Sequence, residues 1–384
     1  MMLLWAIPSV AVVVVALVYQ KLRSLQPQNA VYVIGDLHGD VECARHWVNK
    51  TKLIRNHKWL DSSSFLVFLG DYIDKGPTSR QTVEFVKSLT EKYPQQVTAL
   101  LGNHEVELLR DRSDDPSRWG KGKYFQLAYA ATHPGEYLNY LDEVDSEDEI
   151  VVDALYNASL EVYSQNQHNK VFMLPNDDEI LQYIPTHLRQ LVNERLKVYQ
   201  EAYLDAYRTG TPLGTWLEER PILAVAGGAL FVHGGVSGRA SYFLREENGG
   251  VDHLNDIWKN HSTEDKINTF LDTTPEGQAI YEMLTFRGNH NDEACTYLPR
   301  LLPEGVTRLG VGHTPGYSVK FKCDGNFLAL DSSLGRYFRN SGNEYCRGDK
   351  LQRSSNGRYI CRKMNDKCQG QIIRIVNGEV ELIE

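Results

Sequence analysis

The chain has 384 residues, of which 42% are hydrophobic and 24% charged, the composition of a globular protein rather than of a disordered or collagen-like one. This length suits a single large domain or two modest ones. The formal net charge of −9 argues against a general nucleic-acid binder, because contacts with phosphates require a basic surface. Six cysteines in so long a chain exclude a disulfide-dominated miniprotein. We therefore expect an enzyme-sized domain that does not bind nucleic acid.

The first segment, Met1 to Val18, is uncharged and mostly apolar. Eighteen such residues lie between the length of a signal-peptide core and that of a short membrane-spanning helix. A buried core helix is less favoured because the segment has no polar face. A basic start and a clear small-residue cleavage site are both missing. We therefore expect residues 1–29 to contain an uncleaved membrane anchor, or else a secretory signal segment, followed by a polar linker.

The side of the membrane on which the domain lies is left open by the sequence. Lys21 and Arg23 follow the apolar segment and favour a cytosolic domain. Four cysteines in the last 62 residues favour the opposite arrangement if they form disulfides, although unpaired cytosolic thiols explain them nearly as well. Their spacing lacks the paired C-x-x-C of a zinc ribbon. They are Cys323, Cys346, Cys361 and Cys368.

Short apolar runs bounded by glycine and acidic residues follow the linker, a pattern typical of buried strands. In chain order they cover residues 30–34, 65–69, 97–101, 222–226, 229–232, 308–311 and 327–330. Gly227-Gly228 predicts a hairpin turn between two of these strands. Asn377-Gly378 predicts a second hairpin, between strands at 371–376 and 379–383.

Residues 106–220 have a different pattern, which predicts a mostly helical insertion. Residues 187–208 carry leucine and valine at helical spacing and end at Thr209-Gly210, so they predict a helix. Residues 137–163 and 179–184 are weaker helix candidates. The tyrosines of this stretch are expected to pack in the interior rather than to contact a substrate. They are Tyr129, Tyr137, Tyr140, Tyr199, Tyr203 and Tyr207.

Side chains suited to metal binding and acid–base chemistry follow five of the predicted strands. In an open α/β sheet ligands bind beyond the carboxyl ends of the strands, so we expect these side chains to lie close together. Glycines beside them allow sharp turns and close approach of the backbone. The residues are Asp36, His38, Asp71, Asp74, Asn103, His104, His233 and His313.

These side-chain types favour a site for two metal ions. Carboxylate, imidazole and amide oxygen suit divalent or trivalent Mn, Fe or Zn. Asp36 and His38 are two residues apart and can reach one ion, and Asp71 can bridge two ions. Asn103, His233 and His313 would hold the second ion. Any one segment alone is more often an ordinary loop or core histidine, but five in order, each after a strand, are not explained in that way.

The segments GDLHGD, GDYIDKG, GNHE, HGG and GHTP, in this order, resemble the signature of the phosphoprotein phosphatase family of calcineurin-like metallophosphoesterases. The segments WLEERPILAVAGGALFVHGGV, LTFRGNHNDEACTYLPRLL and GVGHTPGYSV are most similar to the Shewanella-like protein phosphatases. The resemblance covers residues 31–335, more loosely in the insertion. It implies an α/β (α+β) fold of two packed mixed β-sheets flanked by helices. We expect a metallophosphatase domain over residues 30–384, with a cysteine-containing tail at 335–384.

The resemblance also implies roles for individual residues. The ligands of the family's first metal ion correspond to Asp36, His38 and Asp71. Those of the second metal ion correspond to Asp71, Asn103, His233 and His313. A hydroxide bridging the two ions is implied to attack phosphorus in line.

The family's acid–base and phosphate-binding residues also have counterparts. His104 matches the general acid that protonates the leaving group, and Asp74 matches its carboxylate partner. Arg287 matches an arginine that binds phosphate oxygens through two parallel hydrogen bonds. Lys75 stands where the family usually has arginine, so it keeps the charge needed for phosphate binding but not the planar fork. A lysine at this position also resembles the pattern of diadenosine-tetraphosphatase-like relatives. Those relatives usually lack the acidic residue that corresponds to Asp74.

We therefore expect a metal-dependent phosphatase that hydrolyses phosphomonoesters, above all phosphorylated Ser, Thr or Tyr in proteins. Its partners would be a phosphorylated protein or small phosphoester and, through the N-terminal segment, a membrane. A dinucleoside polyphosphate hydrolase is the alternative enzyme. A membrane-tethered scaffold without activity is a third reading, which the intact set of metal ligands and the intact acid pair disfavour.

Overall fold

The structure is a computed structural model that describes residues 29–113, 133–166, 177–245, 247, 249–336, 351–353, 359–361 and 367–384. The predicted anchor segment, Tyr129 and Cys346 lie outside these residues. Within these ranges no helix has the length and apolar character needed to cross a membrane.

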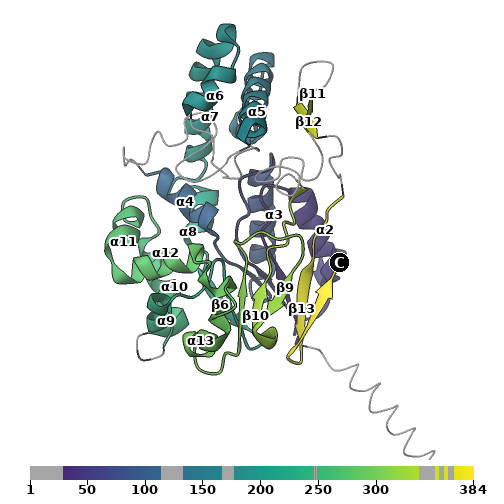
Figure 1. Ribbon diagram of the computed structural model, residues 1–384, viewed down its shortest axis with the longest axis vertical. Coiled ribbons are helices and arrows are strands. Elements are labelled where there is room, and N and C mark those ends of the chain that lie inside the picture. Colours follow the sequence, from purple (N-terminus) through teal and green to yellow (C-terminus); the bar gives the residue numbers. More distant parts are fainter. Residues whose placement is uncertain are drawn as a thin grey trace, which may run out of the picture.

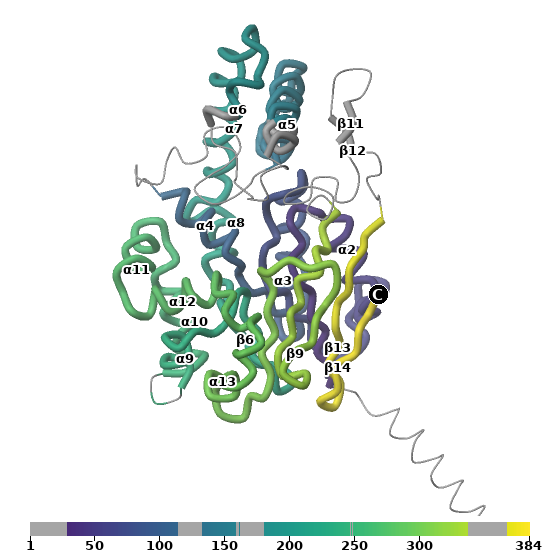
Figure 2. Tube along the Cα trace, in the orientation of Figure 1, coloured from purple at the N-terminus to yellow at the C-terminus, as the bar shows by residue number. Residues whose placement is uncertain are grey.

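The first of two central sheets has the strand order β14-β13-β1-β4-β5. Its strands are β1 (Val31–Ile34), β4 (Phe65–Phe68), β5 (Val97–Ala99), β13 (Ile372–Val376) and β14 (Glu379–Ile383). The first three are parallel and are connected through helices α2 (Val41–Thr51) and α3 (Ser79–Lys92), as parallel strands require. The β13–β14 hairpin pairs antiparallel with β1, so Figure 2 shows the yellow end of the chain beside its purple beginning.

The second sheet has the order β6-β7-β8-β10-β9. Its strands are β6 (Leu223–Ala226), β7 (Ala229–Val232), β8 (Arg308–Val311), β9 (Lys320–Lys322) and β10 (Phe327–Ala329). The strands β7, β8 and β10 run parallel to one another. Gly227 and Gly228, both with positive φ, form the predicted turn between β6 and β7. Apart from β9, these strands and those of the first sheet agree with the predicted runs to within two residues.

The two sheets pack face to face around an apolar layer. This layer contains side chains from β1, β4 and β13 of one sheet and from β7 and β10 of the other, among them Val33, Val67, Phe231, Leu328 and Ile373. The outer faces are covered by helices, shown in Figure 1, which lie in a larger apolar cluster. The helices that follow β7 are α9 (Gly238–Phe243), α10 (Gly250–His261), α11 (Ile267–Thr273), α12 (Pro275–Thr285) and α13 (Ala294–Leu301). The predicted fold class is confirmed.

The described part of the insertion is helical, and Figure 1 shows its helices α5, α6 and α7 standing beyond one end of the sheets. Its elements are α4 (Asn103–Asp111), η1 (Pro134–Tyr140), α5 (Ser146–Asn166), α6 (Asp177–Tyr183), η3 (Thr186–Leu188), α7 (Arg189–Asp205) and α8 (Pro212–Glu218). A single helix over 137–163 was a wrong prediction. Leu141 is extended, and the Asp145 carboxylate accepts hydrogen bonds from the N–H groups of Glu147 and Asp148, so a new helix starts there.

The tyrosines of the insertion pack on one another as predicted. The five that the structure describes are buried and make ring contacts between η1 and α7: Tyr137, Tyr140, Tyr199, Tyr203 and Tyr207.

Two disulfides join segments that are distant in the sequence. Cys43 of α2 pairs with Cys368, just before β13, and Cys295 of α13 pairs with Cys323, just after β9. Two of the four clustered cysteines therefore pair with cysteines outside the cluster.

Candidate metal centre

The predicted ligand residues and His104 lie at the carboxyl ends of strands from both sheets. Side chains from the first sheet follow β1, β4 and β5, and two histidines follow β7 and β8. All seven are between 0 and 6% exposed: Asp36, His38, Asp71, Asn103, His104, His233 and His313.

Asp71 lies at the middle of this cluster. Its Oδ2 is 3.6 Å from Nε2 of His38, and its Oδ1 is 3.2 Å from Nε2 of His233. One carboxylate oxygen therefore faces a histidine of the first sheet and the other a histidine of the second. The ligand atoms of Asp71, His233 and His313 lie within 4.8 Å of one another, as do those of His38, Asp71 and His104. This arrangement suits a carboxylate that bridges two cations.

The orientation of two histidines also fits cation binding. Nδ1 of His38 is 3.1 Å from the carbonyl oxygen of Ile73, and Nδ1 of His233 is 2.8 Å from that of Leu69. A carbonyl oxygen only accepts hydrogen bonds, so Nδ1 carries a proton in both rings and Nε2 is directed at the cluster. Nε2 of His233 lies 3.0 Å from Oδ1 of Asn103, which is also an acceptor. Such a backbone contact fixes the ring of a histidine that binds a metal through its other nitrogen.

The electrostatics of the cluster favour positive charge. Burial lowers the pKa of His38 to about 3 and that of His313 to about 2, so both rings are neutral, as ligands must be. Burial alone would lower the pKa of His233. The neighbouring Asp71 carboxylate outweighs burial and raises this pKa, so the position favours a positive charge. Burial would likewise raise the pKa of Asp71, but His233 and His104 hold it well below its usual value. Buried carboxylates of this kind require a compensating charge.

His104 and Asp74 form a separate contact at the edge of the cluster. Nδ1 of His104 is 2.6 Å from Oδ2 of Asp74, whose side chain has no exposed surface. The other ring nitrogen, Nε2, lies 3.8 Å from Oδ2 of Asp71 and so is directed toward the cluster. A carboxylate on one side of the ring and a nitrogen directed at the cluster on the other is the arrangement of an oriented acid or base.

Two cationic side chains border the cluster. The guanidinium of Arg287, which follows α12, donates from Nη1 to Oγ1 of Thr314 at 3.0 Å, and Thr314 is the neighbour of His313. Lys75 lies next to Asp74 in the left-handed region, with φ of 66°, and its charge adds to burial in lowering the pKa of His38. Both predicted phosphate-binding residues are therefore close to the predicted ligands.

Glu105 is a residue of the site to which the sequence analysis gave no role. Its Oε2 accepts hydrogen bonds from the N–H groups of Asp71 and Gly102 at 2.8 and 2.9 Å, and its Oε1 accepts from those of Tyr72 and Ile73 at 2.7 and 3.2 Å. One buried carboxylate thus joins the loop after β4 to the loop after β5. A Cβ atom on Gly102 would lie 2.0 Å from Oδ1 of Asp71, so only glycine fits there. The sequence signal was the position of Glu105 in GNHE, at the start of a helix.

Asp331 is the second such residue. It follows β10, is 2% exposed and lies beside Asp36. The pKa of Asp36 is raised well above its usual value. Burial is the largest cause, and the charges of Asp331 and Asp71 add to it. The available signal was the same as for the other residues, an acidic side chain directly after the apolar run at 327–330.

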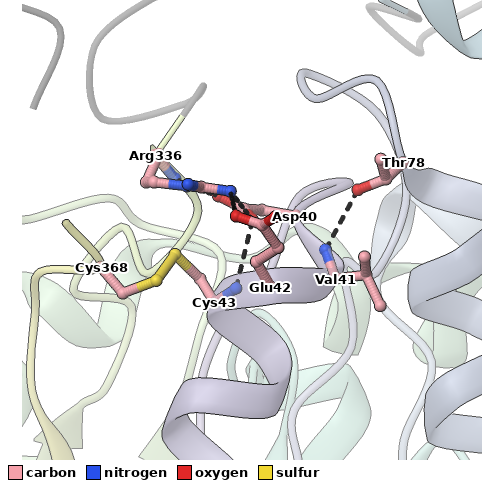
Figure 3. Close-up of a disulfide and its surroundings, with 7 residues drawn as sticks. All are labelled: Asp40, Val41, Glu42, Cys43, Thr78, Arg336 and Cys368. Atoms are coloured by element: carbon pink, nitrogen blue, oxygen red, sulfur yellow. Dashed lines mark hydrogen bonds and ion pairs between the residues drawn. A yellow bond between two sulfur atoms is a disulfide. The ribbon is translucent and has the colours of Figure 1, made fainter. Parts of the chain in front are cut away.

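The segment after His38 is held by contacts from distant parts of the chain, drawn in Figure 3. Arg336 donates to both carboxylate oxygens of Asp40 at 2.8 and 2.9 Å, and Asp40 accepts from the N–H of Cys43 at the start of α2. The Cys43–Cys368 disulfide lies next to this ion pair. The loop that carries Asp36 and His38 is therefore fastened where it enters α2.

Comparisons with known proteins find similar sequences and folds among phosphoesterases. Residues 30–198 match the family model of the calcineurin-like phosphoesterases. The chain is 24% identical to an uncharacterized protein of Schizosaccharomyces pombe over 316 residues, which are 79% of this chain and 73% of that protein. It is 36% identical to the serine/threonine-protein phosphatase SIT4 of Candida albicans over 86 residues, only 21% of this chain and 26% of that phosphatase.

Among solved structures, the cold-active protein-tyrosine phosphatase of a psychrophilic Shewanella species has a TM-score of 0.51 at 17% sequence identity. The match covers 92% of this chain and 80% of that one. At this identity the similarity concerns the fold.

Proposed function

We propose that the chain is a phosphoester hydrolase that hydrolyses phosphomonoesters, in particular phosphorylated Ser, Thr or Tyr of proteins, and the match of residues 30–198 to the calcineurin-like phosphoesterases supports this proposal. The observation that carries the proposal is the position of Asp71, with one carboxylate oxygen facing His38 and the other facing His233. A buried cluster of this composition, with the His104–Asp74 contact at its edge, suits metal-assisted phosphoryl transfer to water.

The donor set fits two metal ions. Asp36, His38 and Asp71 would hold one ion, and the second would be held by Asp71, Asn103, His233 and His313. Imidazole nitrogen and oxygen donors without thiolate suit Mn, Fe or Zn. Bound ions would supply the acidification of the attacking water and the neutralisation of charge on the phosphate.

His104 would deliver the proton that the leaving oxygen needs. Its Nε2 is directed at the cluster, while Asp74 binds Nδ1 and fixes the ring. Arg287 and Lys75 would bind the phosphate oxygens that do not react. Arg287 is held for this purpose by the hydroxyl of Thr314.

A dinucleoside polyphosphate hydrolase is the second candidate, and Lys75 is the observation that favours it. A compact ammonium group binds a phosphate chain as a point charge, whereas arginine would fix one phosphate in a single orientation. The His104–Asp74 contact supports the phosphomonoesterase, because it serves an alkoxide or phenoxide leaving group that requires a proton.

We further propose that the domain lies in an oxidising compartment. The disulfides Cys43–Cys368 and Cys295–Cys323 support this side of the membrane over the cytosolic side, because disulfides persist mainly in secreted and lumenal proteins. Protease protection of the domain in intact membrane vesicles, combined with gel mobility before and after reduction, tests this proposal. Free thiols at all four positions would contradict it.

The decisive experiment for the activity compares substrates and metals on the purified full-length chain. We expect hydrolysis of para-nitrophenyl phosphate and of phosphopeptides, loss of activity after chelation and recovery with added Mn. Elemental analysis should find two metal ions per chain. Turnover of dinucleoside polyphosphates well above that of every phosphomonoester would replace the first candidate by the second. Absence of turnover on both classes with metal bound would contradict both.

A further inference from the structure

We propose that Glu136, a buried residue of the helical insertion, is a positioning residue for the His104–Asp74 pair. The proposal rests on the proposed role of His104 in protonating the leaving group. Two hydrogen bonds, Glu136 to Ser79 and Ser79 to Asp74, connect Glu136 with that pair through the first turn of α3.

The first turn of α3 has backbone N–H groups that its own cap residue does not bind. The first N–H groups of any helix lack partners within the helix. Thr78, the residue before α3, usually would cap them, but its hydroxyl makes no such bond here. It donates instead to the carbonyl oxygen of Gly39 at 2.7 Å and accepts from the N–H of Val41 at 3.1 Å, a contact seen in Figure 3. Thr78 is thus engaged with the loop that carries His38.

Glu136 takes the place of the missing cap. Its Oε2 accepts from the N–H of Ser79 at 2.7 Å and its Oε1 from the N–H of Arg80 at 2.8 Å. The residue has no exposed surface, and a carboxylate at the start of a helix is favoured by the helix dipole. Asn139, on the same turn of η1, adds a bond from Nδ2 to the carbonyl oxygen of Pro77 at 2.8 Å. The insertion is therefore fastened to the start of α3 at several points.

Ser79 also binds Asp74 and so connects it to Glu136. Its hydroxyl oxygen accepts from the N–H of Asp74 at 3.0 Å, and Asp74 in turn binds His104. Asp74 and Lys75 both lie in the left-handed region, with φ of 67° and 66°, which side chains rarely adopt unless their surroundings hold them there. The contacts run from Glu136 through Ser79 and Asp74 to His104.

This path gives the insertion a part in proton transfer. Without the Glu136 carboxylate, the N–H groups of Ser79 and Arg80 are buried and unpaired, so the first turn of α3 shifts or frays. The hydroxyl of Ser79 then no longer fixes the backbone of Asp74, and the orientation of the His104 ring is lost. Metal binding is expected to persist, because Glu136 and Ser79 are not ligands in the proposed set.

The test is a comparison of leaving groups in the full-length, metal-loaded enzyme. In the hydrolysis of phenyl phosphate the phenoxide leaving group needs a proton on its oxygen. In the hydrolysis of 2,4-dinitrophenyl phosphate the 2,4-dinitrophenoxide group leaves readily without a proton. For Glu136→Gln we expect kcat for phenyl phosphate to fall roughly tenfold or more, a part of the ~100-fold effect typical of a general acid, with less than about a threefold fall for 2,4-dinitrophenyl phosphate. The amide keeps the size of the side chain but replaces one acceptor by a donor.

A matched control is Asp148→Asn, which alters another buried carboxylate of the insertion. Asp148 binds the hydroxyl of Tyr199 and the guanidinium of Arg195, and among the described residues its carboxylate makes no hydrogen bond to α3. This variant should lower kcat for both substrates by the same factor. A leaving-group effect in Asp148→Asn as large as in Glu136→Gln would overturn the proposal, since any weakening of the insertion would then suffice.

Ser79→Ala tests the same path without altering the insertion. It should reproduce the leaving-group effect, and the double variant with Glu136→Gln should be no worse than the poorer single variant. Ser79→Ala also carries the test if Glu136→Gln does not fold. His104→Ala calibrates the assay. Absence of a leaving-group effect in His104→Ala contradicts the proposed acid, whereas an effect there without one in Glu136→Gln and Ser79→Ala contradicts only the role of Glu136.

Discussion

The two sheets contribute differently to the metal centre. The loops of the first sheet carry four residues in the left-handed region, His38, Asp71, Asp74 and Lys75, and are held by buried side chains such as Glu105. The loops of the second sheet carry one such residue among the predicted site residues, His313. Backbone strain at a site persists only where the surroundings enforce it. The proposed bridging carboxylate and proton donor thus lie on the strained half.

The second sheet supplies histidines on less strained loops and holds the arginine. Asn289, two residues after Arg287, is buried and forms two hydrogen bonds with the backbone of Val236 in the loop after β7. We therefore expect changes in the first half to remove metal or turnover, changes at His233 or His313 to remove one ion, and changes at Arg287 to weaken substrate binding.

The largest effect is expected from Asp71→Asn. The amide replaces one of the two anionic oxygens between His38 and His233 by an NH₂ group, so one ion loses its Asp71 ligand and the other keeps only a neutral amide oxygen. Metal content measured by elemental analysis should fall for both ions, and activity should fall with it. The comparison variant is His313→Ala, which should lower the content of one ion only. Full occupancy in Asp71→Asn would count against a bridging position.

The second largest effect is expected from His104→Ala. Removal of a general acid lowers turnover by about two orders of magnitude or more. Metal content should persist, because His104 is not a ligand in the proposed set. Steady-state kinetics with phenyl phosphate and metal analysis on the same sample make the measurement. Normal turnover in this variant would remove His104 from the mechanism.

Glu105→Gln should lower the free energy of unfolding, in addition to any effect on turnover. The amide NH₂ would face two backbone N–H donors, so buried polar groups lose partners at a cost of about 2 kcal/mol in the free energy of unfolding. Urea denaturation of the variant and the parent measures this difference. Glu143→Gln, an exposed substitution of the same type, should change the value by less than about 0.5 kcal/mol. Equal stability of both variants would show that the Glu105 contacts are dispensable.

The smallest effect is expected from Arg287→Lys, a substitution in the half of the site that belongs to the second sheet. The charge remains while the two parallel hydrogen bonds to a phosphate are lost, so KM should rise about tenfold with a smaller change in kcat. Substrate titrations with para-nitrophenyl phosphate provide both constants. A fall in kcat at unchanged KM would place Arg287 with the first half, as a group that acts in the transition state.

The residues of the candidate metal centre could be selected from the sequence because their signal is local. Each of Asp36, Asp71, His233 and His313 follows an apolar run, directly or after one glycine, and the strand order brings such ends together. Asp331 shows the same signal and was overlooked. The break between η1 and α5 depends on Asp145, whose capping contacts are local but resemble many acidic positions in helices.

Other features depend on contacts that no local pattern contains. Cys43 and Cys368 are 325 residues apart, so their pairing required the sheet order. Glu136 is one of many acidic residues in the insertion, and only tertiary packing places it at the start of α3.

The pairing of β1 with β13 has a consequence for biosynthesis. The strand that carries Asp36 and His38 at its end emerges from the ribosome long before its antiparallel neighbour β13. A strand without its partner gains little from folding, because loop closure over such a separation must come first. We therefore expect the nascent chain to acquire metal only after β13 has emerged, and chains that stop before residue 372 to be recognised by chaperones rather than to fold into a partly active enzyme.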